Sequence, residues 1–187
     1  TKSQNKAIDE IFKDLSKKFP ISGLILININ TLGKTVLWGN DFFKENIAGI
    51  DLYIGAESFF QVNTNMLSVL ARDLQNNLDL SADKVLADLY CGIGTFGILL
   101  SKKVKRVIGI EAAVENFFFT EKNIKLNNIK NFDVRLSDCK EAISSLLKQK
   151  IDLAIVDPPR KGMDMGICNT LAQDGPPSIA YISCNPT

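Results

Sequence analysis

The sequence contains no histidine among its 187 residues. Ser–His and Cys–His nucleophile pairs are therefore excluded within this chain, and so are metal sites built on imidazole ligands. Its four cysteines include no Cys-x-x-Cys pair, which argues against zinc or an iron–sulfur cluster bound by this segment. We expect reduced thiols, as in a cytoplasmic protein, rather than disulfides.

No charge of one sign predominates, because 22 basic residues face 21 acidic ones. A protein that only binds nucleic acid usually carries a basic excess, so an RNA substrate would need a local phosphate-binding surface or parts outside this chain. No apolar run approaches the roughly 20 residues that span a bilayer, and no signal-peptide pattern is present. We expect a cytoplasmic monomer with no membrane or metal partner. The chain starts without Met and stops directly after a site-like motif, which indicates a fragment of a longer protein.

The first 58 residues are expected to form a small α+β lobe. Apolar residues recur at helical spacing from position 8 to 19 and predict an amphipathic helix that ends at Pro20. Strand-like runs then surround a turn and predict a hairpin, and one more short strand follows. These three strands are expected at residues 23–29, 34–39 and 51–56.

From residue 59 onward strands and helices alternate, which predicts βαβ units with right-handed crossovers and a mostly parallel sheet. The fold class is therefore α/β, with one large domain over residues 59–187. Its first helix is expected to begin at Asn63 or Thr64, either of which can cap it. The sheet strands are expected at residues 84–90, 106–111, 132–136, 151–156 and 179–183, and the helices between them at 95–102, 113–126, 140–148 and 165–171.

The segment from Asp88 to Gly97 joins the first strand of this domain to its helix, and its glycines at 92, 94 and 97 spell GxGxxG. Glycine permits a tight turn and lets a ligand approach the backbone closely. Glu111 ends the next strand, where a carboxylate can accept hydrogen bonds from both ribose hydroxyls. The pattern predicts an adenosine-containing cofactor. A glycine-rich connector with an acid near a helix start is the structural alternative.

Two cofactors fit this pattern, a nicotinamide dinucleotide and S-adenosyl-L-methionine. A pyrophosphate favours the N-terminus of a helix, whereas a sulfonium cation favours carboxylate and carbonyl oxygens such as those of Asp88. The glycine motif by itself leaves both open.

A second motif, Asp157-Pro158-Pro159-Arg160, follows the fourth strand. The two prolines stiffen the chain and hold the Asp157 carboxylate in place. Methyltransferases that act on exocyclic amino groups resemble this loop but carry an aromatic residue where Arg160 stands, so amino methylation is disfavoured. A loop cap and a solvated surface charge are the structural alternatives for Asp157 and Arg160.

Cys184 follows the last expected strand, beside Asn185 and Pro186. The carboxyl ends of parallel strands carry the ligand crevice, so this thiol and Asp157 are expected to face one pocket. Such a pair suits covalent attack on a pyrimidine ring, through the small thiolate fraction present at neutral pH. An inert core cysteine is the alternative. The other cysteines, at 91, 139 and 168, have no such placement and are taken as structural.

Five motifs occur in one order: FFQVN at 59–63, DLYCGIGTFG at 88–97, Glu111, DPPRKG at 157–162 and SCNPT at 183–187. In this order they resemble the RNA uracil-5-methyltransferase family over the whole chain. The resemblance implies a Rossmann-like class I S-adenosylmethionine methyltransferase sheet whose C-terminal strands are missing, preceded by part of a central domain. It implies formation of 5-methyluridine in RNA, with rRNA favoured and tRNA as the alternative.

The resemblance also assigns roles. Cys184 would add to carbon 6 of uracil, carbon 5 would take the methyl group from S-adenosyl-L-methionine, and Asp157 would reach the uracil edge. Arg160 and Asn185 would bind the substrate. Asp138 also fits a helix N-cap, and Thr95 stands where the family often has asparagine. The residues implied at the cofactor are Gln61, Tyr90, Gly92, Gly94, Thr95, Glu111, Asp138 and Asp157.

The chain also departs from the family. The general-base glutamate, the last two strands of the usual seven, and any N-terminal RNA-binding barrel or iron–sulfur segment are expected outside it. We therefore expect a fragment that binds the cofactor but turns over poorly alone. An NAD-dependent oxidoreductase and a non-catalytic cofactor-binding fragment with an inert Cys184 are the rival hypotheses.

Overall fold

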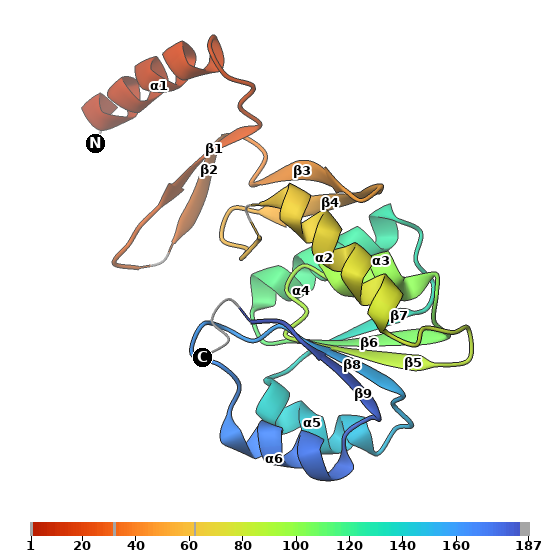
Figure 1. Cartoon of the computed structure of the whole chain (residues 1–187). Helices are drawn as coiled ribbons and strands as arrows, with labels where there is room; N and C mark the ends of the chain where they lie inside the picture. Colours follow the sequence, from red (N-terminus) through yellow and green to blue (C-terminus); the bar gives the residue numbers. More distant parts are fainter. Residues whose placement is uncertain (1, 32, 62, 184–187) are drawn as a thin grey trace. The chain divides into compact units, whose positions relative to one another are not determined.

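The computed structural model describes residues 2–31, 33–61 and 63–183. The chain divides into two compact units, Thr1–Phe43 and Lys44–Thr187, and Figure 1 shows the elements of each. No helix among the described residues is long and apolar enough to cross a membrane.

The smaller unit contains one helix and one hairpin. Helix α1 (Lys2–Ser16) precedes strands β1 (Gly23–Ile27) and β2 (Lys34–Gly39), which pair antiparallel as the sequence predicts. The ring centroids of Phe12 and Trp38 lie 4.7 Å apart, so an apolar side chain of α1 packs on β2. The predicted helix and hairpin are both present.

A second hairpin follows, formed by β3 (Phe42–Ile47) and β4 (Ile50–Gly55). The sequence analysis expected β4 but missed β3. Lys44, Glu45 and Asn46 interrupt the apolar alternation that announces a strand. The connecting turn uses Ala48 and Gly49 at φ values of 50° and 87°, as a two-residue hairpin turn requires. Alanine is an uncommon residue there, so the usual turn signal was absent.

The larger unit is built on a parallel sheet of five strands: β5 (Val85–Leu89), β6 (Arg106–Glu111), β7 (Phe132–Leu136), β8 (Leu153–Val156) and β9 (Ser178–Tyr181). Their order is β7-β6-β5-β8-β9, and all four neighbouring pairs are parallel. The predicted α/β class and its parallel sheet are confirmed. The chain leaves β5 toward β6 on one side and returns to β8 on the other, and ligands bind at such a switch point in open α/β sheets.

Helices cover both faces of this sheet (Figure 1). Helices α2 (Thr64–Asn77), α3 (Thr95–Ser101) and α4 (Val114–Leu126) lie on one face, and α5 (Cys139–Leu147) and α6 (Met165–Asp174) on the other. The central strands are buried on both sides, since every residue of β8 is buried and β5 is exposed only partly at its first residue. Asn63 caps α2, as predicted, by accepting a hydrogen bond from the Met66 N–H at 3.0 Å.

One buried amide links the second hairpin to the sheet unit. The Asn123 side chain on α4 donates to the Tyr53 carbonyl at 3.0 Å and to the Ile93 carbonyl at 3.1 Å, and accepts from the Tyr53 N–H at 2.7 Å. The amide of Asn127, one turn later, donates to the Asp51 carbonyl at 2.8 Å. Strand β4 therefore packs within the compact unit that begins at Lys44. The proposed domain boundary at residues 58 and 59 stays a prediction.

Replacing this amide should destabilise the fold. In Asn123→Ala the N–H and C=O of Tyr53 and the C=O of Ile93 lose their partner in the interior, at a cost of roughly 2–4 kcal/mol in the free energy of unfolding. Urea denaturation measures it. The control Asn77→Ala removes an exposed amide that donates to the Asp73 carbonyl of its own helix, and a change within about 0.5 kcal/mol is expected. Equal losses in both variants would contradict a linking role for Asn123.

Candidate cofactor site and family membership

The loop between β5 and α3 is an unusual backbone segment. Tyr90, Gly92 and Gly94 all have positive φ, at 60°, 58° and 84°. The Gly94 N–H donates to the Cys91 carbonyl at 2.9 Å, and the Cys91 N–H donates to the Ile110 carbonyl of β6 at 3.0 Å. These bonds hold a tight turn at the carboxyl end of β5. We call residues 90–94 the glycine loop.

Two glycines of the motif have different functions. A Cβ placed on Gly92 would meet nothing within 4 Å, so the backbone there borders open space that a ligand can approach. A Cβ placed on Gly97 would overlap the Phe132 ring and lie 2.9 Å from Asp88 Oδ2. Gly97 therefore serves close packing of α3 against the sheet, and Gly92 leaves the loop accessible.

Asp88, the last residue but one of β5, is buried beneath this loop. Its Oδ2 accepts a hydrogen bond from the Gly97 N–H at 2.8 Å, and its Oδ1 has no hydrogen-bond partner among the described residues. Burial raises the pKa of this carboxyl to about 7, the Gly97 N–H opposes the rise, and the charges of Asp157 and Glu111 add to it. The charges of Glu111 and Asp157 therefore both act on Asp88.

Glu111 ends β6 and holds the glycine loop from the side. Its Oε2 accepts from the Gly92 N–H at 2.8 Å and its Oε1 from the Ala113 N–H at 2.7 Å. Ala113 is the N-cap residue of α4, so the carboxylate does lie at a helix start, as the structural alternative for this residue held. Each oxygen keeps lone-pair capacity for a further donor. Glu111 is thus a fixed acceptor beside the loop.

The structure brings Asp157 and Gln61 together. Asp157 follows β8, and its N–H donates to the Leu89 carbonyl of β5 at 3.3 Å. Burial raises the pKa of its carboxyl, and a hydrogen bond with the Gln61 side chain works against the rise. These residues are far apart in the sequence, yet both lie at the carboxyl edge of the sheet near Asp88. The structure therefore places Gln61 and Asp157 in contact, and their role at the cofactor stays a prediction.

Tyr90 begins the glycine loop, and Asp138 lies near its side chain. Asp138 caps α5, as the structural alternative predicted, by accepting from the Lys140 N–H at 2.7 Å. Burial raises the pKa of the Tyr90 phenol well above its usual value, with further contributions from the neighbouring Cys139 and Asp138. Thr95 is buried in the first turn of α3. Whether these residues contact a cofactor stays a prediction.

Arg160 lies on the surface. The Gly162 N–H donates to the Pro159 carbonyl at 2.8 Å, which closes a turn that presents Arg160 to solvent. The position fits a group that meets a large substrate, and equally the solvated surface charge that was its alternative.

Cys184 and Asn185 lie outside the described residues, so their predicted roles remain predictions. The strand before them is described: Tyr181 lies opposite Val156 in the β8–β9 register, and the Ile182 N–H donates to the Val156 carbonyl at 2.8 Å. The backbone through Ile182 therefore runs beside the end of β8, directly before Asp157. Among the other cysteines, burial raises the pKa of Cys91, and that of Cys139 to about 12, which fits structural thiols.

The sequence analysis missed the polar side of α4. The Thr120 hydroxyl donates to the Gly92 carbonyl at 2.7 Å, and Asn123 donates to the Ile93 carbonyl, so α4 satisfies two carbonyls of the glycine loop. A signal was available: the polar residues Asn116, Thr120, Asn123 and Asn127 recur at helical spacing along a helix that also carries three phenylalanines.

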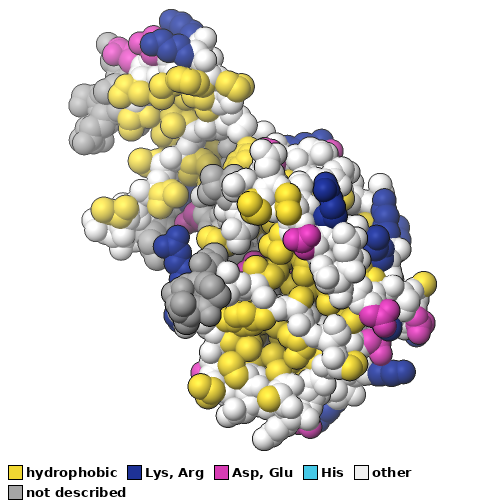
Figure 2. Space-filling model, viewed as in Figure 1, with side chains coloured by type: hydrophobic (Ala, Val, Ile, Leu, Met, Phe, Trp, Pro, Cys, Tyr) yellow, Lys and Arg dark blue, Asp and Glu magenta, His cyan; other side chains and the backbone are white. Residues whose placement is uncertain are grey.

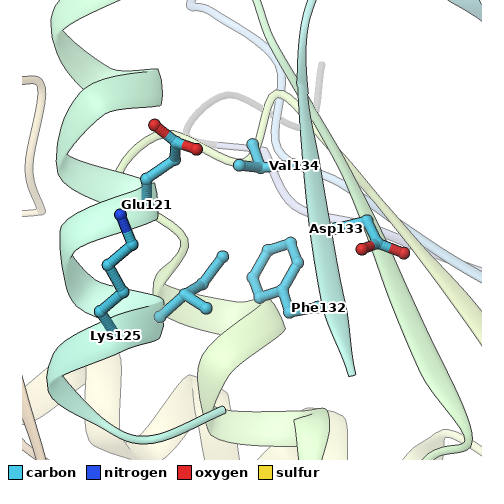
Figure 3. Close-up of a pocket in the computed structure, with 6 residues that line it drawn as sticks. Glu121, Lys125, Phe132, Asp133 and Val134 are labelled. Carbon is cyan, nitrogen blue, oxygen red and sulfur yellow. The ribbon is translucent and has the colours of Figure 1, made fainter. Parts of the chain in front are cut away.

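A shallow cavity of about 210 Å³ lies elsewhere, between α4 and β7 (Figure 3). None of the predicted site residues lines it, and the ring of Phe132 forms part of its wall. In the parts of the chain that the structure describes, no group of three histidine, cysteine, aspartate or glutamate side chains could hold a metal ion. The cavity lining consists of Glu121, Ile124, Lys125, Phe132, Asp133 and Val134.

The family described as tRNA (uracil-5-)-methyltransferase matches residues 6–187. The chain belongs to this family. An uncharacterized RNA methyltransferase of Listeria innocua is 34% identical over 187 residues, which cover 95% of this chain and 41% of the relative. One from Enterococcus faecalis is 33% identical over 96% of this chain and 41% of its own length. The chain thus spans about two fifths of these relatives (41% of their length).

Solved structures agree with the family assignment. The tRNA (uracil-54, C5)-methyltransferase of Pyrococcus abyssi, crystallised with S-adenosyl-L-homocysteine, matches with a TM-score of 0.69 and 31% identity over 80% of this chain and 36% of its own. A putative methyltransferase of Escherichia coli shares the fold, with a TM-score of 0.59 and 22% identity over 78% of this chain and 85% of its own. The predicted family and the class I methyltransferase fold are confirmed, and the predicted cofactor agrees with the ligand of the Pyrococcus relative.

The buried acid of this uracil-5-methyltransferase family member makes stability depend on pH. The folded-state pKa of Asp88, about 7, lies above its unfolded value of 3.8. The protonated Asp88 contributes its full share to the free energy of unfolding below its unfolded-state pKa. This contribution is lost as the pH rises through its folded-state pKa, with a slope of about 1.4 kcal/mol per pH unit. The unfolding free energy of the wild type minus that of Asp88→Asn should fall along this slope in urea titrations from acidic to neutral pH. Parallel curves would contradict it.

Proposed function

We propose that the protein containing this chain transfers a methyl group from S-adenosyl-L-methionine to carbon 5 of a uridine in RNA. The observation that carries the proposal is the glycine loop surrounded by Asp88, Glu111 and Asp157 at the switch point of the sheet. Membership in the uracil-5-methyltransferase family supports the same reaction.

The acids around the loop favour one cofactor over the other. S-adenosyl-L-methionine, when bound, supplies an activated methyl group on a sulfonium cation. Asp88 has a buried Oδ1 without a described partner, and Glu111 presents acceptors to hydroxyl groups beside the open backbone of Gly92. A pyrophosphate would be repelled by the same carboxylates, which weakens the case for a nicotinamide dinucleotide. The proposed cofactor contacts are Gln61, Tyr90, Gly92, Gly94, Thr95, Glu111, Asp138 and Asp157.

The chemistry proposed for the substrate side is covalent. The Cys184 thiolate forms a bond to carbon 6 of uracil, which makes carbon 5 nucleophilic and ready to accept the methyl group. Carbon 5 would take the methyl group as the bond from that group to the sulfonium sulfur breaks, which leaves the donor as a neutral thioether. A base then removes the proton from carbon 5, the double bond re-forms, and the bond from carbon 6 to the Cys184 sulfur breaks. Family resemblance implies a glutamate downstream of Thr187 as this base. Asp157, stiffened by the following prolines, would contact the uracil edge, with Arg160 and Asn185 binding the surrounding RNA.

The RNA is proposed to be ribosomal, as the sequence analysis favours. Transfer RNA is the second candidate, because the family description and the Pyrococcus relative both name it. Both RNAs therefore belong in every assay of the whole protein.

Cofactor binding tests the acid beside the loop. Glu111→Gln keeps the side-chain shape but removes the charge and one acceptor, and it should weaken S-adenosyl-L-homocysteine binding at least about tenfold, equal to 1.4 kcal/mol. Isothermal titration calorimetry measures it, and the exposed Glu121→Gln on α4 serves as the control with unchanged affinity. Tighter binding of NAD than of S-adenosyl-L-homocysteine would instead support an oxidoreductase.

Covalent trapping tests the nucleophile. With the full-length protein, S-adenosyl-L-methionine and RNA carrying 5-fluorouridine, a protein–RNA adduct that survives denaturation should accumulate, because fluorine cannot leave as a proton does. Denaturing electrophoresis measures the adduct with ribosomal and with transfer RNA.

Cys184→Ala should abolish this adduct, and Cys168→Ala, which changes a partly buried thiol on α6, should retain it. An adduct that persists in Cys184→Ala would overturn the assignment of the nucleophile. Full methyl transfer by that variant would support an inert cysteine.

A further inference from the structure

The opposite edge of the sheet has a different charge. The loops that precede β6 and β7 at its amino edge carry Lys102, Lys103, Lys105 and Lys130, all exposed. We call these four residues the amino rim. None of them forms an ion pair within the described parts of the chain. In Figure 2, Lys and Arg side chains gather along the right-hand edge of the larger unit, with acidic side chains near them.

Two other cations of this edge are paired with acids. Lys84 pairs with Asp79, and Arg106 Nε lies 2.6 Å from Asp133 Oδ2. The pKa of Asp83 lies below its usual value because Ser81 donates a hydrogen bond to it, with smaller contributions that include the charges of Lys84 and Lys150. The positive charge of the amino rim is not neutralised by any ion pair in the described part of the chain, so it is available to a partner.

Hydrogen bonds hold the backbone of the amino rim in place. The Asn131 amide reaches across from the loop before β7 and donates to the carbonyls of Ser101 at 2.8 Å, Val104 at 2.9 Å and Lys105 at 3.3 Å. The Lys105 N–H donates to the Lys84 carbonyl at 2.8 Å. The loops that carry the lysines are therefore fastened to each other, and binding a ligand there requires little ordering of the backbone.

The acids of the candidate site and the lysines of the amino rim lie at opposite ends of the strands. Asp88, Glu111 and Asp157 lie at the carboxyl edge, and the amino rim lies at the other end of strands that rise about 3.3 Å per residue, which places it roughly 17 Å away. The overall count of 22 basic and 21 acidic residues does not reveal where the lysines of the amino rim and the acids of the candidate site lie. Lysine ammonium groups are suited to phosphate as point charges, without base recognition.

We propose that the amino rim binds the phosphate backbone of the RNA substrate, at a stretch remote from the target uridine and without regard to sequence. This inference rests on the proposed function for the identity of the nucleic acid. It supplies the local phosphate-binding surface that a chain of balanced charge needs to hold RNA. The amino rim cannot reach the reacting base, so it contributes affinity and not chemistry.

The test uses the full-length protein and fluorescence anisotropy with labelled substrate RNA over a range of salt concentrations. The triple variant Lys102→Gln, Lys103→Gln, Lys105→Gln should weaken RNA binding about tenfold and lower the slope of log K against log salt by about 2, as expected for two to three lost phosphate contacts. RNA with the target uridine replaced by cytidine should show the same loss. Methyl transfer at saturating RNA should be unchanged.

The matched control removes three lysines from α1 and the residues after it, by Lys13→Gln, Lys17→Gln and Lys18→Gln, and should leave affinity and salt slope near the wild type. Lys102 and Lys103 also lie at the C-terminal end of α3, where cations stabilise a helix. Lys130→Gln removes a cation in the loop before β7 instead, and should lower the salt slope by about 0.7–0.9 without affecting α3.

Unchanged affinity and slope in the triple variant, or an equal loss in the α1 control, would overturn the amino rim as an RNA surface. The 5-fluorouridine adduct at saturating RNA separates this failure from that of the proposed function. An adduct that forms normally while the salt slope stays unchanged refutes only the amino rim, and absence of the adduct in the wild type refutes the covalent reaction.

Discussion

The glycine loop must satisfy its backbone polar groups in a place that is partly closed to water, and the rest of the site follows from that requirement. Glu111 accepts the Gly92 N–H, Thr120 donates to the Gly92 carbonyl, and Asn123 donates to the Ile93 carbonyl. Each of these side chains comes from a neighbouring element and is itself buried. Leaving a buried polar group unpaired destabilises the fold by more than one hydrogen bond stabilises it. The loop, the end of β6 and α4 therefore form one unit.

This unit also explains why the acids can serve a ligand. Two backbone N–H groups hold Glu111 in its orientation, and Asp88 remains under the loop although burial disfavours its charge. A positively charged ligand that entered beside Gly92 would offset the repulsion that Glu111 and Asp157 exert on Asp88. The same carboxylates would oppose an anion. The preference for a sulfonium cofactor is therefore a property of the whole arrangement rather than of a single contact.

The sheet separates two kinds of surface. Its carboxyl edge collects acids around the glycine loop, whereas its amino edge carries lysines on loops that Asn131 fastens together. A balanced composition therefore need not mean a weakly charged surface for RNA. The overall balance does not describe either edge, because alternate loops of a parallel sheet lie at opposite edges and carry different sets of charges.

Much of this could be predicted from the sequence. Buried apolar runs predicted all five strands of the parallel sheet, and the glycines, Glu111 and the Asp-Pro-Pro-Arg motif lie at the carboxyl ends of strands, as predicted. The caps Asn63 and Asp138 were readable because capping depends on residues close in the chain. Strand β3 was missed because its charged residues and its Ala-Gly turn hide the alternation.

By itself the sequence determined the elements, their order and the chemistry available at the strand ends, since these depend on local periodicity and residue type. Only the tertiary structure decided which side chains meet. Gln61 contacts Asp157, and Asn123 donates hydrogen bonds to the carbonyls of Tyr53 and Ile93, so residues far apart in the chain meet. The same packing leaves one buried oxygen of Asp88 without a partner among the described residues. Such contacts depend on how helices and strands pack, and no local pattern encodes the distances that packing creates.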